Sequence, residues 1–184
     1  RQEISSLMEV SRILVSPLSF HDQLKNILEK LRNVIDFDGS SVLLRKENLL
    51  VAETFQMQLS QEITEKLIQP FLRPDLVDER FWNNEALIFP DVRSQCKDAR
   101  EFSSLTELIF NIVPSEMVSW IGIPIKSRSV LIGVLSAHAT QVGFFTPEMA
   151  ELMGAFANQI ATIFENNRLY RKAQIGRAAC RERV

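Results

Sequence analysis

The chain has 184 residues, of which 46% are hydrophobic and 24% charged, a composition typical of a globular domain with a sizeable core. Its formal net charge is −2, with both signs mixed along the chain, which argues against a nucleic-acid-binding surface or a polybasic membrane anchor. The longest apolar run, Val130 to Ala137, is far shorter than the ~20 residues that a membrane-spanning helix needs.

The first 35 residues predict two helices separated by a proline. Residues 2–15 place their apolar side chains on one stripe, and Pro17 ends that helix. Ser19 is expected to cap the second helix, with Asp22 three positions later in a capping-box arrangement. Apolar residues then recur at the spacing of a helix that packs on a core: Leu24, Ile27, Leu28, Leu31, Val34 and Ile35.

The next segment predicts a β-hairpin followed by mixed elements. Residues 36–39 are typical of a turn, and residues 40–44 and 49–54 of two strands with a tip at 46–48. A third helix is expected to begin at Ser60 and end near Gln69, because two prolines follow. The remaining predicted elements are a short strand over 86–89, a turn at 90–91 and a helix over 100–110.

The C-terminal part predicts two strands and one long helix. The strands are expected over 120–126 and 130–138, with a turn at 127–129. Thr146, Pro147 and Glu148 provide a cap, a first-turn proline and a charge that suits the helix dipole. A helix from there to Gln174 is about 28 residues or ~42 Å long, whereas a strand of eight residues spans ~26 Å. The helix is therefore expected to run roughly 15 Å past the sheet.

Part of this helix has the apolar spacing of a coiled coil. Its residues recur in steps of four, three, four and three, and the polar one can fix the register: Phe156, Ile160, Ile163, Asn167 and Tyr170. The pattern predicts a dimer seam. A surface helix that frays at its end is the alternative.

Residues 175–184, IGRAACRERV, differ from the rest of the chain. They resemble the translation of a sequencing adapter, so we predict a non-native tail and a native domain over 1–174. Because the tail contains Cys180, the domain retains one cysteine, Cys96, which permits no intramolecular disulfide and no thiolate zinc cluster. A reducing, cytoplasmic setting is expected. Arg1 opens directly into a helical pattern, so we also expect a longer parent protein.

Several stretches in this order resemble the GAF domain family, which is related to the PAS domains. The stretches are EVSRILVSPLSFHDQLKNILEKL at 9–31, ALIFPDVRSQ at 86–95, SWIGIPI at 119–125, VLIGVLSA at 130–137 and GFFTPEMAELMGAFANQIATIFENNRLY at 143–170. The resemblance covers about residues 5–172. It implies an α+β fold, in which a central antiparallel sheet has helices on one face and a small-molecule pocket on the other. It also implies that the N- and C-terminal helices form a dimer bundle and lead to an output domain.

The aromatic residues of the irregular segment are the best candidates for the pocket. An apolar cavity with a few polar groups is what a small ligand needs. The predicted pocket residues are Phe81, Trp82, Phe89, Asp91, Phe102, Phe110, Trp120 and His138. The alternative is that these rings simply fill a second core.

Specialised members of the family provide other hypotheses. Those that reduce free methionine sulfoxide need a nucleophilic and a resolving thiol, and Cys96 is alone. Those that bind bilin commonly attach it in a Cys-His pair, but neither His21 nor His138 follows a cysteine. His138 is the one candidate haem ligand. The Asn-Lys…Phe…Asp-Glu pattern of cyclic-nucleotide-binding members has no convincing counterpart here, because no Asn-Lys precedes Asp78-Glu79.

The sequence thus predicts a cytoplasmic sensory or regulatory GAF module with no catalytic or metal-binding residues and no required cofactor. We expect a homodimer through the terminal helices and an output domain in the same parent chain, either a histidine kinase or a cyclic-dinucleotide enzyme. A small-molecule ligand is the remaining expected partner, without nucleic acid or membrane contact. The alternative is a non-covalent receptor for a cyclic nucleotide or a tetrapyrrole.

Overall fold

The structure is a computed structural model that describes residues 18–47, 49–56, 86–93 and 117–181. These residues form antiparallel strands and two helices. The elements follow in the order α2 (Phe20–Arg32), β1 (Gly39–Lys46), β2 (Leu49–Gln56), β3 (Leu87–Phe89), β4 (Ser119–Ser127), β5 (Val130–Ala139) and α6 (Pro147–Arg181). The helices predicted over 2–15, 60–69 and 100–110 lie outside the described residues.

Helix α2 begins where the sequence predicts it and ends earlier. The Ser19 hydroxyl accepts a hydrogen bond from the Asp22 amide at 3.2 Å, which satisfies one of the free donors of the first turn. The helix ends at Arg32, so Val34 and Ile35 follow it instead of continuing it. Ile35 is still buried at 3% exposure, whereas Val34 is 59% exposed. The helical spacing of apolar residues therefore continues past the end of α2 into the turn that follows it.

The described strands form one five-stranded antiparallel sheet in the order β2-β1-β5-β4-β3. Two hairpins, β1–β2 and β4–β5, are local in sequence, and the central pair β1–β5 joins them across the chain. Strand β3 pairs with β4 at one edge and β2 lies at the other. The predicted central antiparallel sheet is confirmed. Strands β1, β2, β4 and β5 are one or two residues longer than predicted at one or both ends, whereas β3 begins one residue later than predicted.

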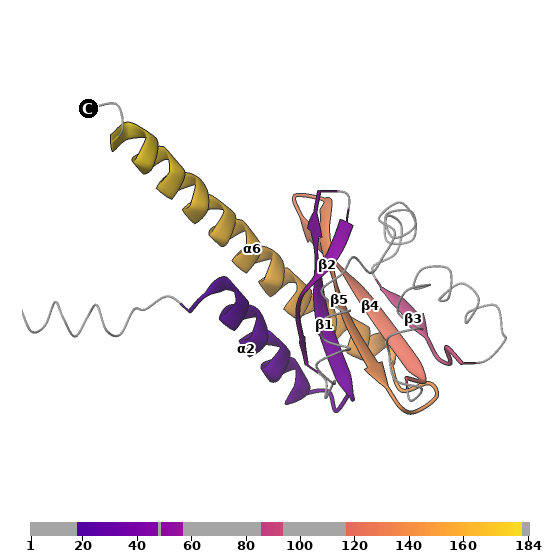
Figure 1. Cartoon of the computed structure of the whole chain (residues 1–184). Coiled ribbons are helices and arrows are strands. Elements are labelled where there is room, and N and C mark those ends of the chain that lie inside the picture. Colours follow the sequence, from indigo (N-terminus) through magenta and orange to yellow (C-terminus); the bar gives the residue numbers. More distant parts are fainter. Residues whose placement is uncertain (1–17, 48, 57–85, 94–116, 182–184) are drawn as a thin grey trace, which may run out of the picture.

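Both helices cover the same face of the sheet (Figure 1). Because successive strand residues point to opposite faces, alternate residues of β1, β4 and β5 meet these helices. Together they form one buried apolar core, and its central members are Leu24, Leu28, Leu31, Val42, Leu44, Ile121, Ile123, Leu135, Met153, Ala157 and Ile160.

Helix α6 leaves the sheet and continues into solvent (Figure 1). Thr146 caps it as predicted, since its hydroxyl accepts from the Met149 amide at 3.3 Å. The helix was expected to end at Gln174 but reaches Arg181. Two alanines and two arginines of high helix propensity follow Gly176 within the helix, which explains the continuation. The origin of residues 175–184 stays a prediction.

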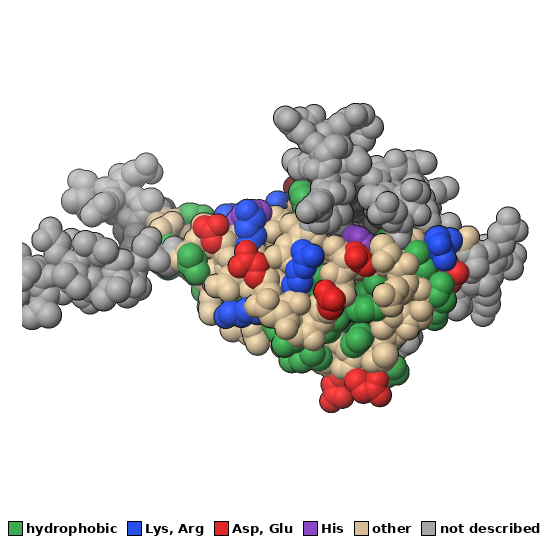
Figure 2. Space-filling model, turned by 90° about the horizontal axis from the view of Figure 1, so that it is seen from below, with side chains coloured by type: hydrophobic (Ala, Val, Ile, Leu, Met, Phe, Trp, Pro, Cys, Tyr) green, Lys and Arg blue, Asp and Glu red, His purple; other side chains and the backbone are tan. Residues whose placement is uncertain are grey.

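The described surface carries charges of both signs. The face in Figure 2 intersperses Lys and Arg with Asp and Glu and gathers no extended patch of one sign. Neither described helix combines the length and apolarity that a membrane crossing requires.

Candidate functional site

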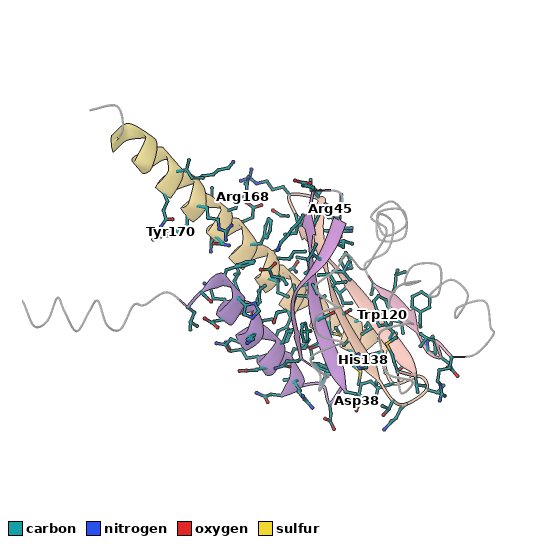
Figure 3. The ribbon with its side chains drawn as sticks, viewed as in Figure 1. Asp38, Arg45, Trp120, His138, Arg168 and Tyr170 are labelled. Atoms are coloured by element: carbon teal, nitrogen blue, oxygen red, sulfur yellow. The ribbon has the colours of Figure 1, made fainter. Side chains whose placement is uncertain are left out.

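A row of aromatic and small residues crosses the sheet on the face away from the helices. Phe89 of β3 pairs with Trp120 of β4, Trp120 pairs with His138 of β5, and His138 pairs with Gly39 of β1. The neighbouring residues of these strands, such as Ile121 and Ala137, belong to the helix-side core, so this row faces the opposite way. Figure 3 shows Trp120 and His138 on adjacent strands, with Asp38 near the end of the sheet.

Two glycines allow the rings of this row to lie against the sheet. A side chain at Gly122 would overlap the outer atoms of the Trp120 indole, so this ring folds along its own strand and covers the glycine. A side chain at Gly39 would overlap the His138 imidazole in the same way, across to the next strand. The glycines are needed here for close approach rather than for backbone freedom.

The aromatic members of the row are removed from solvent. Phe89 and Trp120 are 5% and 6% exposed, and their ring centroids lie 5.9 Å apart with the planes tilted by 47°. This separation is within the range of favourable aromatic pairs. The contact favours the alternative in which these two rings pack as a second core.

A pair of hydroxyl groups lies one step along the sheet from this row. Ser41 of β1 and Ser136 of β5 are 2.8 Å apart between their Oγ atoms and share a hydrogen bond. Ser136 is directly opposite Gly122 in the register, so the hydroxyls neighbour the Trp120 indole. A hydroxyl pair can donate one further hydrogen bond and accept others, which gives this apolar face a polar centre.

His138 is partly buried and its charge is disfavoured. Burial lowers the pKa of His138 below its ordinary value, and the nearby Asp38 carboxylate opposes that shift by its negative charge. Asp38 itself is held by the backbone, because its amide donates to the His138 carbonyl at 3.0 Å and its Oδ2 accepts from the Thr140 amide at 2.7 Å. His138 therefore presents a neutral imidazole near pH 7.

The structure brings together some of the predicted pocket residues. Phe89, Trp120 and His138 share one row, whereas Phe81, Trp82, Phe102 and Phe110 lie outside the described residues. Asp91 lies just beyond β3, and its Oδ1 accepts from the Arg93 amide at 2.9 Å. The sequence did not reveal Gly39, Ser41, Gly122 and Ser136, since their proximity depends on strand register.

The predicted dimer seam divides into an inner and an outer part. Ile160 is fully buried in the domain's own core, and Phe156 and Ile163 pack against that core. The Ile160 side chain therefore already contacts its own domain, and the dimer seam itself stays a prediction. Asn167 is half-buried and Tyr170 is 62% exposed.

The described residues of this face offer apolar rings and hydrogen-bonding groups. In the described residues the two serine hydroxyls bond to each other, and neither forms a hydrogen bond with His138 that would activate it as a nucleophile. The same described residues contain no group of three or more His, Cys, Asp or Glu side chains that could hold a metal ion. Cys96 lies outside the described residues.

Comparisons with known proteins agree with this fold. The family model of the GAF domain matches residues 19–164. No curated protein sequence matches the chain.

Three similar solved structures illustrate the range of proteins that share the fold. The GAF domain/HD domain protein from Geobacter sulfurreducens has a TM-score of 0.67 at 14% identity, covering 82% of this chain and 95% of that one. A two-component sensor histidine kinase domain from Sinorhizobium meliloti 1021 has 0.60 at 14%, with 83% and 95% covered. The free methionine-R-sulfoxide reductase from Neisseria meningitidis, in complex with its substrate, has 0.61 at 19%, with 89% of each chain covered. At these identities the likeness concerns the fold.

Proposed function

The chain belongs to the GAF domain family, and we propose that it is a sensory or regulatory module that relays a signal to an output domain in a longer parent protein. The proposed signal enters at the Trp120–His138 face and leaves along α6. The sensor histidine kinase domain with the same fold supports this kind of setting, and a histidine kinase or a cyclic-dinucleotide enzyme is the proposed output.

The observation that carries the proposal is the change of environment along α6. Ile160 is fully buried, whereas every described side chain from Leu169 to Ile175 is exposed. From Leu169 to the end of the helix at Arg181, 13 residues rise about 20 Å. A helix that is anchored in a core at one end and free at the other can transmit a change in its angle or register.

The free part of α6 is the proposed dimer contact. Leu169, Tyr170 and Ile175 are 54%, 62% and 70% exposed, and Leu18 at the start of α2 is 56% exposed. Figure 1 shows the start of α2 and the outer part of α6 on the same side of the sheet, where terminal helices of two copies can pair. We propose that Asn167 and Tyr170 begin this seam, in place of Ile160.

Sedimentation of the full chain tests the dimer. We expect a dimer at micromolar concentration and a monomer for Tyr170→Asp, because a charge in the seam is costly to bury. Val142→Asp is the matched control, since Val142 is 60% exposed in the loop before α6, at the opposite end of that helix from Tyr170. A strict monomer at high micromolar concentration, or equal effects of both variants, would remove the dimer from the proposal.

The second candidate function is a non-covalent receptor for a cyclic nucleotide or a tetrapyrrole. The apolar rings of Trp120 and Phe89, the hydroxyl pair and the neutral His138 imidazole favour an aromatic ligand with polar edges. A thermal-shift screen with cyclic nucleotides, and a visible spectrum after co-expression with haem or bilin, test it. His138→Gln should weaken a response that the control His21→Gln leaves unchanged, because His21 is exposed on α2. No response to any ligand would leave a relay module.

We further propose that this chain is non-catalytic and cytoplasmic. The reductase from Neisseria meningitidis has the same fold, so activity toward free methionine sulfoxide is the enzymatic alternative. That chemistry requires a thiol nucleophile and a resolving thiol. The native part of the sequence, as predicted, contributes Cys96 alone. Reduction of free methionine sulfoxide that is lost in Cys96→Ser would revive the enzymatic alternative.

A further inference from the structure

Helix α6 is tied to the β4–β5 hairpin at the point where it leaves the sheet. The Ser127 hydroxyl, at the end of β4, donates a hydrogen bond to Glu165 Oε1 at 2.6 Å. The second oxygen of the same carboxylate accepts two hydrogen bonds from Arg168, at 3.1 Å from Nε and 2.8 Å from Nη2. We call Ser127, Glu165 and Arg168 the exit clamp.

The clamp adds polar contacts between two elements that also share the apolar core. Glu165 is restrained from both sides, since Arg168 belongs to its own helix and Ser127 to the sheet. The Arg128 side chain of the adjacent turn adds positive charge. These hydrogen bonds and charges lower the pKa of Glu165, so its carboxylate is ionised near pH 7 and accepts strongly.

The hairpin turn beside the clamp is strained. Its two central residues, Arg128 and Ser129, have positive φ angles of 49° and 66°. A two-residue hairpin turn of this type normally uses Asn-Gly or Asp-Gly, because other side chains disfavour such angles. The β4–β5 register also shifts between Ile125 and Lys126, just before the turn. The turn beside the exit clamp therefore holds a strained backbone conformation, and a sequence such as Asn-Gly would adopt the same angles without that strain.

The clamp lies at the boundary between the packed and the free parts of α6. One residue before it, Phe164 contacts Phe20 of α2 edge-on at 6.4 Å between ring centroids. From Leu169 onward the described side chains are exposed. Figure 3 shows Arg168 between the sheet and Tyr170 on the helix. Packing at Phe164 restrains the helix on one side and the clamp restrains it at the hairpin.

We propose that Ser127 and Glu165 are positioning residues that set the angle at which the outer part of α6 leaves the domain. The inference rests on the proposed relay, because that angle matters only if the helix leads to a partner or output domain. A contact of this kind contributes little to stability, since Glu165 and Arg168 are 24% and 39% exposed and exposed ion pairs are weak. Loss of this contact is therefore expected to change the exit angle of α6 and to leave the free energy of unfolding nearly unchanged.

Distances between spin labels within one chain test the inference. One label is placed at Lys25 on α2 and the other at Ile175 on α6, both exposed, in a chain whose Cys96 and Cys180 are replaced by serine. Labelled chain is diluted in unlabelled chain so that only intrachain distances are measured. Glu165 and Ile175 are ten residues apart, about 15 Å along the helix, so a tilt of 15° moves the second label by about 4 Å.

We expect one narrow distance distribution for the parent chain. Ser127→Ala and Glu165→Gln should shift its mean by a few ångströms or broaden it, and Ser127→Thr should restore it because the hydroxyl is kept. Glu151→Gln, an exposed glutamate earlier on α6, is the control and should leave the distribution unchanged. Circular dichroism verifies folding, and the Ser127 pair decides alone if Glu165→Gln does not fold.

Unchanged distributions in Ser127→Ala and Glu165→Gln would overturn the inference, as would an equal change in Glu151→Gln. These outcomes are independent of the oligomeric state, because the distance is measured within a single chain. A monomer with a clamp-dependent distance refutes the dimer and leaves the clamp, whereas a dimer with clamp-independent distances does the reverse.

Discussion

Replacing Ile160 by alanine tests where the inner part of α6 packs. Ile160 is fully buried in the core between the helices and the sheet. The substitution removes three carbon atoms, worth about 2.4 kcal/mol at about 0.8 kcal/mol each. The cavity that remains adds to this loss, so we expect the free energy of unfolding to fall by about 3 to 4 kcal/mol. For a domain of this size that lowers Tm by roughly 6 to 16 °C.

The assay is thermal unfolding followed by circular dichroism at two protein concentrations that differ tenfold. A core substitution lowers stability by the same amount at both concentrations, whereas loss of an intermolecular seam lowers stability more at the higher concentration, where the dimer is populated. Tyr170→Ala is the comparison, and as an exposed residue it should change the intrinsic stability by less than about 0.5 kcal/mol. A loss below about 1 kcal/mol for Ile160→Ala, or one that appears only in concentrated protein, would refute the reasoning.

Further predictions concern the second face of the sheet. Gly122→Ala should cost about 1 to 3 kcal/mol and alter the fluorescence of Trp120, because the added methyl group overlaps the indole. Gly154→Ala, with open space around it, should instead gain about 0.5 to 1 kcal/mol from helix propensity, and equal melting temperatures would contradict this contrast. His138 has a lowered pKa in the folded chain, so the unfolded chain binds the proton more readily and stability should fall as the pH drops below the ordinary value of 6.5. Urea unfolding at pH 7.5 and 5.5 should show a drop that His138→Gln reduces, and an unaltered drop in that variant would assign it to other groups.

Local signals in the sequence predicted most of the elements. The cap at Ser19, the cap at Thr146 and the two hairpins depend on neighbouring residues, and the structure has them within one or two positions. The GAF resemblance predicted the sheet and the shared side of its helices, which the structure confirms. These features are predictable because the residues that determine them are adjacent in the chain.

The partner of an apolar stripe was harder to predict. Spacing in steps of three and four suits both a coiled-coil seam and a helix packed on its own sheet, so the pattern at Phe156, Ile160 and Ile163 could not distinguish them. What decides is the sheet itself, because its helix-side face buries these residues before any second chain can. Near Tyr170, by contrast, the side chains of α6 are exposed and remain available for the predicted seam.

The composition of the candidate site depends on register. Ser41 and Ser136 are 95 positions apart, and only the pairing of β1 with β5 brings their hydroxyls together. The glycine at 39 has no local signal of a ring above it, since His138 acquires that position from strand alignment, whereas Trp120 reaches Gly122 along its own strand. The aromatic residues of the site are conspicuous in the sequence because of their residue type, whereas the small and polar residues around them carry no such signal.

The β1–β5 pairing has a consequence for biosynthesis. At 5 to 20 residues per second, the ribosome needs about 4 to 15 s to add the roughly 75 residues between the end of β2 and the start of β5. During that time the β1–β2 hairpin lacks its central neighbour, and an isolated hairpin is marginally stable. Its apolar residues Val42 and Leu44 then have no completed core to enter. The nascent chain thus exposes the apolar face of this hairpin until its last strand emerges, and the core closes only after β5 has been synthesised.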